Sequence, residues 1–243
     1  MLSWLPDHPI AFPPPAAALD DPAGLLAAGG ALTPAWLVAA YRRGIFPWFS
    51  DGQPILWWSP DPRLVLFPEE IRIRRSLRKR LRHAGFRITA DRAFAEVMVS
   101  CAAPRDGQPG TWITADMQAA YGRLHRLGIA HSVEVWRHER LVGGLYGVAL
   151  GPVFFGESMF SWVPDASKVA LVHLAAAMQA GGGRLIDCQV HTPHLASLGA
   201  RDIARPAFIG YLEEWLGNPP GGVQSGHDVA IAPAWSFETI GAD

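Results

Sequence analysis

The sequence predicts an α+β fold in which helices surround a mixed sheet. Three runs are typical of strands: 140–150, 152–155 and 184–190. The first two are close enough in sequence to form a hairpin-like pair, and a helical segment that begins at Asp165 separates them from the third. Strands separated by helices, with an antiparallel pair among them, favour helices packed on a mixed sheet.

The chain length and a turn-rich segment predict two unequal domains. A chain of 243 residues with 49% hydrophobic content can bury a substantial core. The turn-rich segment SPDPR at 59–63 is the candidate boundary. We therefore expect a small N-terminal domain at 1–61 and a second domain at 62–243, with a poorly ordered Gly- and Pro-rich tail from about 217.

Composition excludes several classes of protein. No run approaches the roughly 20 apolar residues that span a bilayer, and the N-terminus lacks the pattern of a secretory signal. Cys101 and Cys188 form neither a disulfide framework nor a zinc-type spacing. We expect a cytoplasmic monomer without a membrane partner, a metal or a cofactor.

The N-terminal domain is expected to contain two short helices, at 22–30 and at 33–44. Thr33 suits the N-cap of the second helix, Pro34 its first turn and Gly44 the position just past its end. Aromatic residues follow at high density. Trp48 lies between a proline and a turn, where a side chain is more often presented than buried, and Trp112 is a second aromatic at the edge of a loop.

A basic segment, RIRRSLRKRLRHAGFR at 72–87, holds eight of the 21 Lys and Arg residues and no acid. Helical spacing places Arg74, Arg78 and Arg82 on one line and Arg75 and Lys79 on the next. Stacked like charges destabilise a helix unless a partner neutralises them. We expect this face to contact RNA phosphates without reading sequence, although a merely solvated face is the alternative.

Two groups of polar side chains lie in or directly after strands of the predicted sheet. Glu157 comes directly after a hydrophobic strand, in what we expect to be a loop. Asp187 and Gln189 lie in a buried strand, and alternation projects both from one face, opposite Ile186 and Cys188. Because buried polar groups need partners, this pair must complete a polar network or line a cavity.

The chain resembles the leucyl/phenylalanyl-tRNA–protein transferase family over about residues 10–216. The resemblance rests on GIFPWF at 44–49, ILWWSPDPR at 55–63, TWIT at 111–114, GESMFS at 156–161 and LIDCQ at 185–189. It implies a GNAT-type, acetyltransferase-like fold. It also implies transfer of Leu or Phe, with Met as a further candidate, from charged tRNA onto the N-terminal Arg or Lys of proteins, which marks them for degradation. No loop suited to a pyrophosphate is present, which argues against acetyl coenzyme A as a substrate.

The resemblance also implies roles for individual residues. Asp187 and Gln189 would assist the attacking amine, with Asp187 holding or polarising the Gln189 amide, and Glu157 would help to organise the site. The side chains expected to line the pocket for the leucyl or phenylalanyl group are Trp48, Trp112, Leu145, Phe154, Leu171, Leu174, Met178 and Ile186.

Three rival functions remain open from sequence. A cysteine hydrolase would pair Cys188 with His191 or His194, but alternation places the thiol opposite Asp187 and Gln189. A non-catalytic RNA-binding module would explain only the basic segment. A transferase that moves an amino acid from tRNA to a cell-wall peptide would share both the fold and the basic segment.

Overall fold

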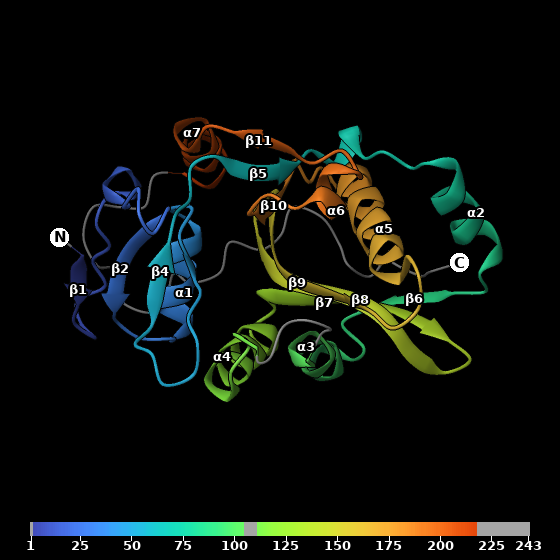
Figure 1. Cartoon of the computed structure of the whole chain (residues 1–243), viewed down its shortest axis with the longest axis horizontal. Coiled ribbons are helices and arrows are strands. Elements are labelled where there is room, and N and C mark those ends of the chain that lie inside the picture. The colour runs from blue at the N-terminus through green and yellow to red at the C-terminus, as the bar shows by residue number, and fades with distance from the viewer. Residues whose placement is uncertain (1, 105–110, 218–243) are drawn as a thin grey trace.

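The computed structural model describes residues 2–104 and 111–217, and these residues form two sheets. The smaller sheet lies in the N-terminal part (Figure 1). It has the strand order β1–β2–β4–β3, with β1 Ser3–Leu5, β2 Leu25–Gly29, β3 Phe46–Pro47 and β4 Leu56–Trp58.

The helix expected at 22–30 is wrong, because β2 occupies its centre. Leu25 to Ala28 are all buried, and β2 pairs with β1 on one side and β4 on the other. A short, continuous apolar run fits either a buried strand or a buried helix, so periodicity could not distinguish them.

The expected cap of the next helix is confirmed. α1 spans Pro34–Tyr41, and the Thr33 side chain accepts a hydrogen bond from the Trp36 backbone N–H at 3.4 Å. The chain then turns at Gly44, whose φ of 70° suits a residue without a side chain. Tyr41, at the last turn of α1, is fully buried.

The larger sheet is mixed, as predicted. Its seven strands have the order β11–β5–β10–β9–β8–β7–β6, and only the β9–β10 pair is parallel. The strands are β5 Arg63–Leu66, β6 Arg87–Ala90, β7 Ala130–Arg137, β8 Arg140–Leu150, β9 Val153–Ser161, β10 Leu185–Gln189 and β11 Arg201–Ile203.

Helices cover both faces of this sheet (Figure 1). α5 lies on one face, and α3 and α4 lie on the other. The helices are α2 Arg75–His83, α3 Phe94–Ala102, α4 Ala115–Arg126, α5 Ala166–Gly181, α6 Pro193–Ala196 and α7 Arg205–Leu216, with 3-10 turns at Pro15–Ala17 and Pro68–Glu70. The predicted α+β class is therefore confirmed, and the N-terminal part contains a small sheet in addition to the expected helix.

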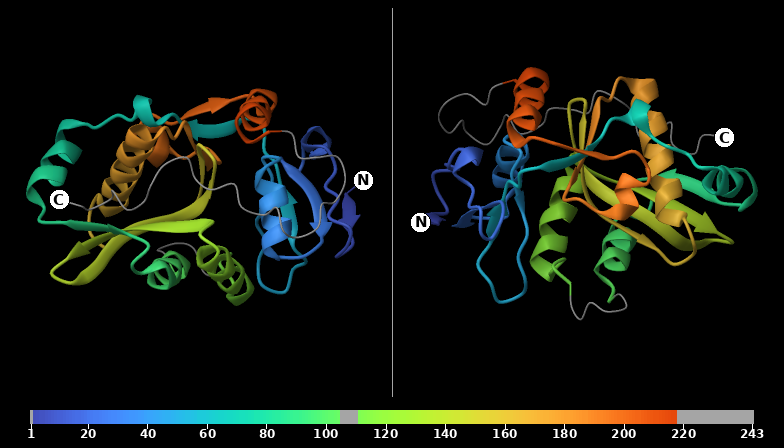
Figure 2. Two further views of the ribbon diagram at one scale, coloured as in Figure 1. Left: turned by 180° about the vertical axis from the view of Figure 1, so that it is seen from behind. Right: turned by 45° about the horizontal axis from the view of Figure 1, so that its top comes forward.

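The two sheets share a hydrophobic core. One group of buried side chains joins residues of β2 and α1 to residues of α3, α4, β8, β9 and α7, and Figure 2 shows α7 close to α1. A second group lies between α5 and the other face of the large sheet. The predicted boundary at residue 61 lies between β4 and β5, and the predicted tail at 218–243 lies outside the described residues.

No helix in the described part of the chain has the length and apolar character needed to cross a membrane.

The two parallel strands diverge after a short pairing. β9 and β10 pair only from Val153 and Leu185 to Phe155 and Asp187. Beyond that point β9 continues along β8 as far as Ser161, whereas β10 ends at Gln189. The polar residues Glu157 and Gln189 lie where this divergence begins.

Candidate active site

Glu157 lies within a strand, so the loop expected at this position is wrong. β8 is long enough to keep pairing with β9 on both sides of Glu157: Tyr146 pairs with Ser158 and Gly147 with Gly156. Glu157 is therefore the extra residue of a β-bulge, a feature that redirects a side chain without ending the strand.

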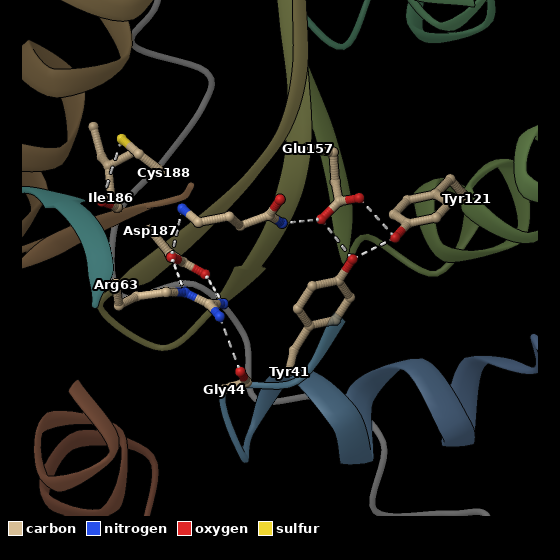
Figure 3. Close-up of polar contacts among 9 residues, drawn as sticks. Tyr41, Gly44, Arg63, Tyr121, Glu157, Ile186, Asp187 and Cys188 are labelled. Carbon is tan, nitrogen blue, oxygen red and sulfur yellow. Dashed lines mark hydrogen bonds and ion pairs between the residues drawn. The ribbon is translucent and has the colours of Figure 1, made fainter. Parts of the chain in front are cut away.

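Three polar side chains from three elements meet at Glu157 (Figure 3). The Tyr41 hydroxyl lies 2.7 Å from Oε1, and the Tyr121 hydroxyl lies 2.9 Å from Oε2. The two phenol hydroxyls are also hydrogen-bonded to each other. Gln189 donates from Nε2 to Oε1 at 2.8 Å. The Glu157 side chain is thereby fixed from α1, α4 and β10.

Burial dominates the electrostatics of Glu157. Loss of solvation raises the pKa of this carboxyl group from 4.5 to about 7, against hydrogen bonds from Tyr41, Tyr121 and Gln189 that lower it. The negative charge of Asp187 raises it further. Burial also raises the pKa of both phenols well above the ordinary range, so they remain neutral donors.

Asp187 is held by a buried ion pair with Arg63. The guanidinium donates from Nε to Oδ1 at 2.8 Å and from Nη2 to Oδ2 at 2.7 Å, and from Nη1 to the Gly44 carbonyl at 3.2 Å. Its central carbon lies 4.8 Å from the ring centre of Phe46 and 4.7 Å from that of Phe208. Arg63 thus ties β10 to the N-terminal part (Figure 3), and its contact with Phe208 also reaches α7.

Asp187 acts on the backbone of Gln189 and does not contact its side-chain amide. Oδ1 accepts the Gln189 backbone N–H at 3.0 Å, which corrects the expectation that Asp187 holds or polarises the amide. Gln189 has a φ of 62°, a left-handed conformation that is uncommon for a residue with a side chain. A bulge at Cys188 accompanies this turn.

The predicted sharing of one face is confirmed. Asp187 and Gln189 meet Arg63 and Glu157 on one side, whereas Ile186 and Cys188 pack with the core group under α5. The Gln189 Nε2 is committed to Glu157, but its amide oxygen makes no hydrogen bond with the described residues. Gln189 is only half-buried, so that oxygen is the open hydrogen-bond acceptor of the site.

The geometry gives Cys188 no role as a nucleophile. Its thiol lies on the opposite side from Glu157, and burial raises the pKa of the thiol. His191 is hydrogen-bonded to Asp202 at 2.9 Å.

The residues expected to line the aminoacyl pocket divide into two sets. Six of them are buried together between α5 and the sheet: Leu145, Phe154, Leu171, Leu174, Met178 and Ile186. Trp112 packs against the other core group. Trp48 is 46% exposed, and its ring centre lies 5.5 Å from that of Trp58. The pocket role of these residues remains a prediction.

The basic segment forms a shorter helix than expected. α2 covers Arg75–His83, because Arg74 has an extended backbone and the segment continues into β6 at Arg87. Arg74, Arg75, Arg78, Lys79 and Arg82 are all exposed, and within the described ranges none of them forms an ion pair with a carboxylate. Arg80, on another side of the helix, lies 3.8 Å from Asp165.

Sequence reasoning missed Arg63, Tyr41 and Tyr121. Arg63 ends the SPDPR segment that marks the candidate domain boundary, and Tyr41 falls within the helix expected at 33–44. No local pattern marks them, because each meets its partner across 36 or more residues of sequence. Within residues 2–104 and 111–217, no group of three His, Cys, Asp or Glu side chains is placed to hold a metal ion.

Two family models match this chain. The model described as leucyl/phenylalanyl-tRNA protein transferase matches residues 65–213, and the model of that transferase's N-terminal domain matches residues 30–61. Curated relatives of the same description come from Chromohalobacter salexigens, 70% identical over 90% of this chain and 86% of the relative, and from Azoarcus sp. strain BH72, 64% identical over 90% and 94%. A relative from Pseudomonas aeruginosa is 58% identical over 91% and 98%.

Solved structures show weaker likenesses. A functionally unknown conserved protein from Staphylococcus epidermidis has a TM-score of 0.40 and 10% identity, over 74% of this chain and 68% of that one. A GCN5-related N-acetyltransferase from Kribbella flavida has a TM-score of 0.33 and 12% identity, over 68% and 58%.

Proposed function

The chain belongs to the leucyl/phenylalanyl-tRNA–protein transferase family, and from this premise we propose its substrates and the roles of its residues. It transfers Leu or Phe, with Met as a further candidate, from charged tRNA onto the N-terminal Arg or Lys of acceptor proteins. The product is marked for degradation, and the reaction takes place in the cytoplasm. The chain acts as a monomer without a metal or cofactor.

The reaction needs alignment more than a strong base. The aminoacyl ester is already activated, and a protein α-amine has an unperturbed pKa of about 7.7 to 8.0, so a useful neutral fraction exists near pH 7. The amine nitrogen forms a bond to the ester carbonyl carbon, and the bond to the ribose oxygen breaks. One proton leaves the nitrogen and one is taken up by that oxygen. Correct placement alone can supply roughly 7 to 11 kcal/mol.

The open amide oxygen of Gln189 is the observation that carries this proposal. Glu157 fixes the amide nitrogen at 2.8 Å, so the oxygen is oriented away from Glu157 and can accept a hydrogen bond from the attacking amine. Asp187 and Arg63 are positioning residues, since they hold the backbone turn that presents Gln189.

Two further surfaces support binding of the charged tRNA. Five exposed cations, Arg74, Arg75, Arg78, Lys79 and Arg82, have no acidic partner among the described residues, which suits contact with phosphates. The six apolar side chains buried together between α5 and the sheet come from α5, β8, β9 and β10, and they would receive the aminoacyl side chain.

A transfer assay with the purified full chain tests the proposal. Radiolabelled leucyl-tRNA is incubated with peptides that begin with Arg or Lys, with a matched peptide that begins with Ala, and with an N-acetylated Arg peptide. We expect label on the first two only. Transfer to a cell-wall-type peptide through a lysine side chain, or RNA binding without any transfer, would overturn the proposal.

A further inference from the structure

Tyr41, Tyr121 and Glu157 form a closed triangle of hydrogen bonds, and the number of protons in it is informative. Each phenol hydroxyl contacts one carboxyl oxygen, and the two hydroxyls contact each other. Three contacts between oxygen atoms need three protons, but two phenols supply only two. With an ionised Glu157, one pair of oxygens would face each other without a hydrogen between them.

A third proton on Glu157 completes the triangle. We infer that Glu157 is a neutral carboxylic acid in the resting site, and that Tyr41 and Tyr121 are positioning residues that fix its orientation through a closed ring of hydrogen bonds. The raised pKa of Glu157 agrees with this state.

Gln189 favours one direction of the ring. Its Nε2 can only donate, and a carbonyl oxygen is a stronger acceptor than the hydroxyl oxygen of an acid, so Oε1, which receives Nε2 at 2.8 Å, is assigned as the carbonyl oxygen. Oε2 then carries the proton and donates to Tyr121, Tyr121 donates to Tyr41, and Tyr41 donates back to Oε1. Every oxygen in the ring donates or accepts as its chemistry requires.

The groups that face Glu157 come from every element packed around it. Asp187, which pairs with Arg63, is the one charged side chain among the described residues that acts on Glu157, and its charge opposes a second negative charge. The neutral groups around the carboxyl are Tyr41 of α1, Tyr121 of α4, Tyr146 of β8 and Gln189 of β10, with Cys101 of α3 beside Tyr146.

The neutral acid suits the proposed aminoacyl transfer, on which this part of the inference rests. A carboxylate beside the attacking amine would favour its protonated form, which cannot attack. A neutral Glu157 still accepts the Gln189 amide and so still orients the acceptor oxygen. A neutral Glu157 in the ring therefore orients Gln189 without placing its own negative charge beside the amine.

Infrared difference spectroscopy on the full chain tests the inference without substrate. Between pH 6 and pH 9 we expect loss of the carbonyl stretch of one protonated carboxylic acid, and we expect this signal to be missing in Glu157→Gln. In Tyr41→Phe the band should move to higher wavenumber, because the carbonyl oxygen loses one donor, and Tyr121→Phe should also move it. Tyr211→Phe, which changes a phenol of α7 stacked on Trp215, is the matched control and should leave the band in place.

The results separate this inference from the proposed function. Absence of a protonated carboxyl band in the wild-type protein at pH 6 overturns the inference, and so does a band that neither phenylalanine variant moves. If one variant fails to fold, the other variant and the wild-type spectrum decide. Because the spectra need no tRNA, failure of the transfer assay would remove the proposed substrates and leave the state of Glu157 standing.

Discussion

Gln189 donates a hydrogen bond from its side-chain amide to Glu157 at 2.8 Å. Gln189 lies two residues beyond Asp187, and Glu157 lies two residues beyond Phe155. Asp187 and Phe155 are the last residues that pair between β10 and β9. A side-chain hydrogen bond thus joins the two strands where their pairing ends. Each residue lies at an irregularity of its strand, Glu157 in a bulge and Gln189 in a left-handed turn. Site geometry is therefore set by departures from regular strand structure.

Replacing Gln189 by alanine should slow transfer while leaving the affinity for charged tRNA unchanged. The loss of one neutral hydrogen bond to the amine corresponds to roughly 1 kcal/mol, or about fivefold in rate. Single-turnover transfer and filter binding measure the two quantities. The exposed Gln53→Ala variant is the control. A parallel loss of tRNA binding would contradict the assignment of Gln189 to the amine.

The Arg63–Asp187 pair should show strong coupling in stability. Both side chains are almost fully buried, so Arg63→Met or Asp187→Leu leaves an unpaired buried charge and should cost about 3 to 5 kcal/mol of unfolding free energy. Replacing both, by Met and Leu respectively, should cost much less than the sum of the single changes. Urea unfolding of the four proteins measures this cycle, and additive losses would show that the two charges do not depend on each other.

Glu157 should make the stability of the folded chain depend on pH. Its folded pKa of about 7 lies above the ordinary 4.5, so the folded state retains a proton that the unfolded chain releases. The stabilisation is complete below about pH 4.5 and is lost as the pH rises through 7, by about 3 kcal/mol in all. The unfolding free energy of wild type minus that of Glu157→Gln should therefore fall by that amount between pH 4 and pH 8. A constant difference over this range would contradict the raised pKa.

The basic face should determine the salt dependence of tRNA binding. If about four of its cations meet phosphates, log affinity should fall with log salt with a slope near −3 to −4. Replacing Arg74, Arg78 and Arg82 together by Gln should flatten this slope by up to about 3, equally for any tRNA body.

A matched variant on another surface makes this result specific. Replacing Arg126, Arg137 and Arg140, which are also exposed, by Gln removes the same charge from α4, β7 and β8. Equal flattening of the salt slope in both variants would show that tRNA does not bind specifically along α2. An unaltered slope in the α2 variant would show that the basic face is only solvated.

The six apolar side chains buried together between α5 and the sheet should favour leucyl over alanyl groups. A leucyl side chain has about three more carbons than an alanyl one, worth roughly 2.4 kcal/mol at ~0.8 kcal/mol per buried carbon, or on the order of 50-fold in rate. Transfer rates from leucyl-tRNA and alanyl-tRNA measure this preference. Comparable rates would mean that these side chains serve only as core.

The sequence by itself determined the α+β class, the cap of α1, the exposed basic face and the shared side of Asp187 and Gln189. These features depend on local patterns: alternation along a strand, cap residues and charge spacing. The prediction of a helix at 22–30 is wrong because a short apolar run fits a buried strand equally well. The prediction of a loop at Glu157 is wrong because β8 continues to pair with β9 beyond the polar residues.

Only the tertiary structure decided what these residues do to one another. Asp187 binds Arg63, and Glu157 binds Tyr41 and Tyr121. Gln189 adopts a left-handed backbone conformation that is uncommon for a residue with a side chain. The physical reason is that buried charges and hydroxyls are satisfied by partners brought from distant segments, and local sequence carries no signal for such pairing.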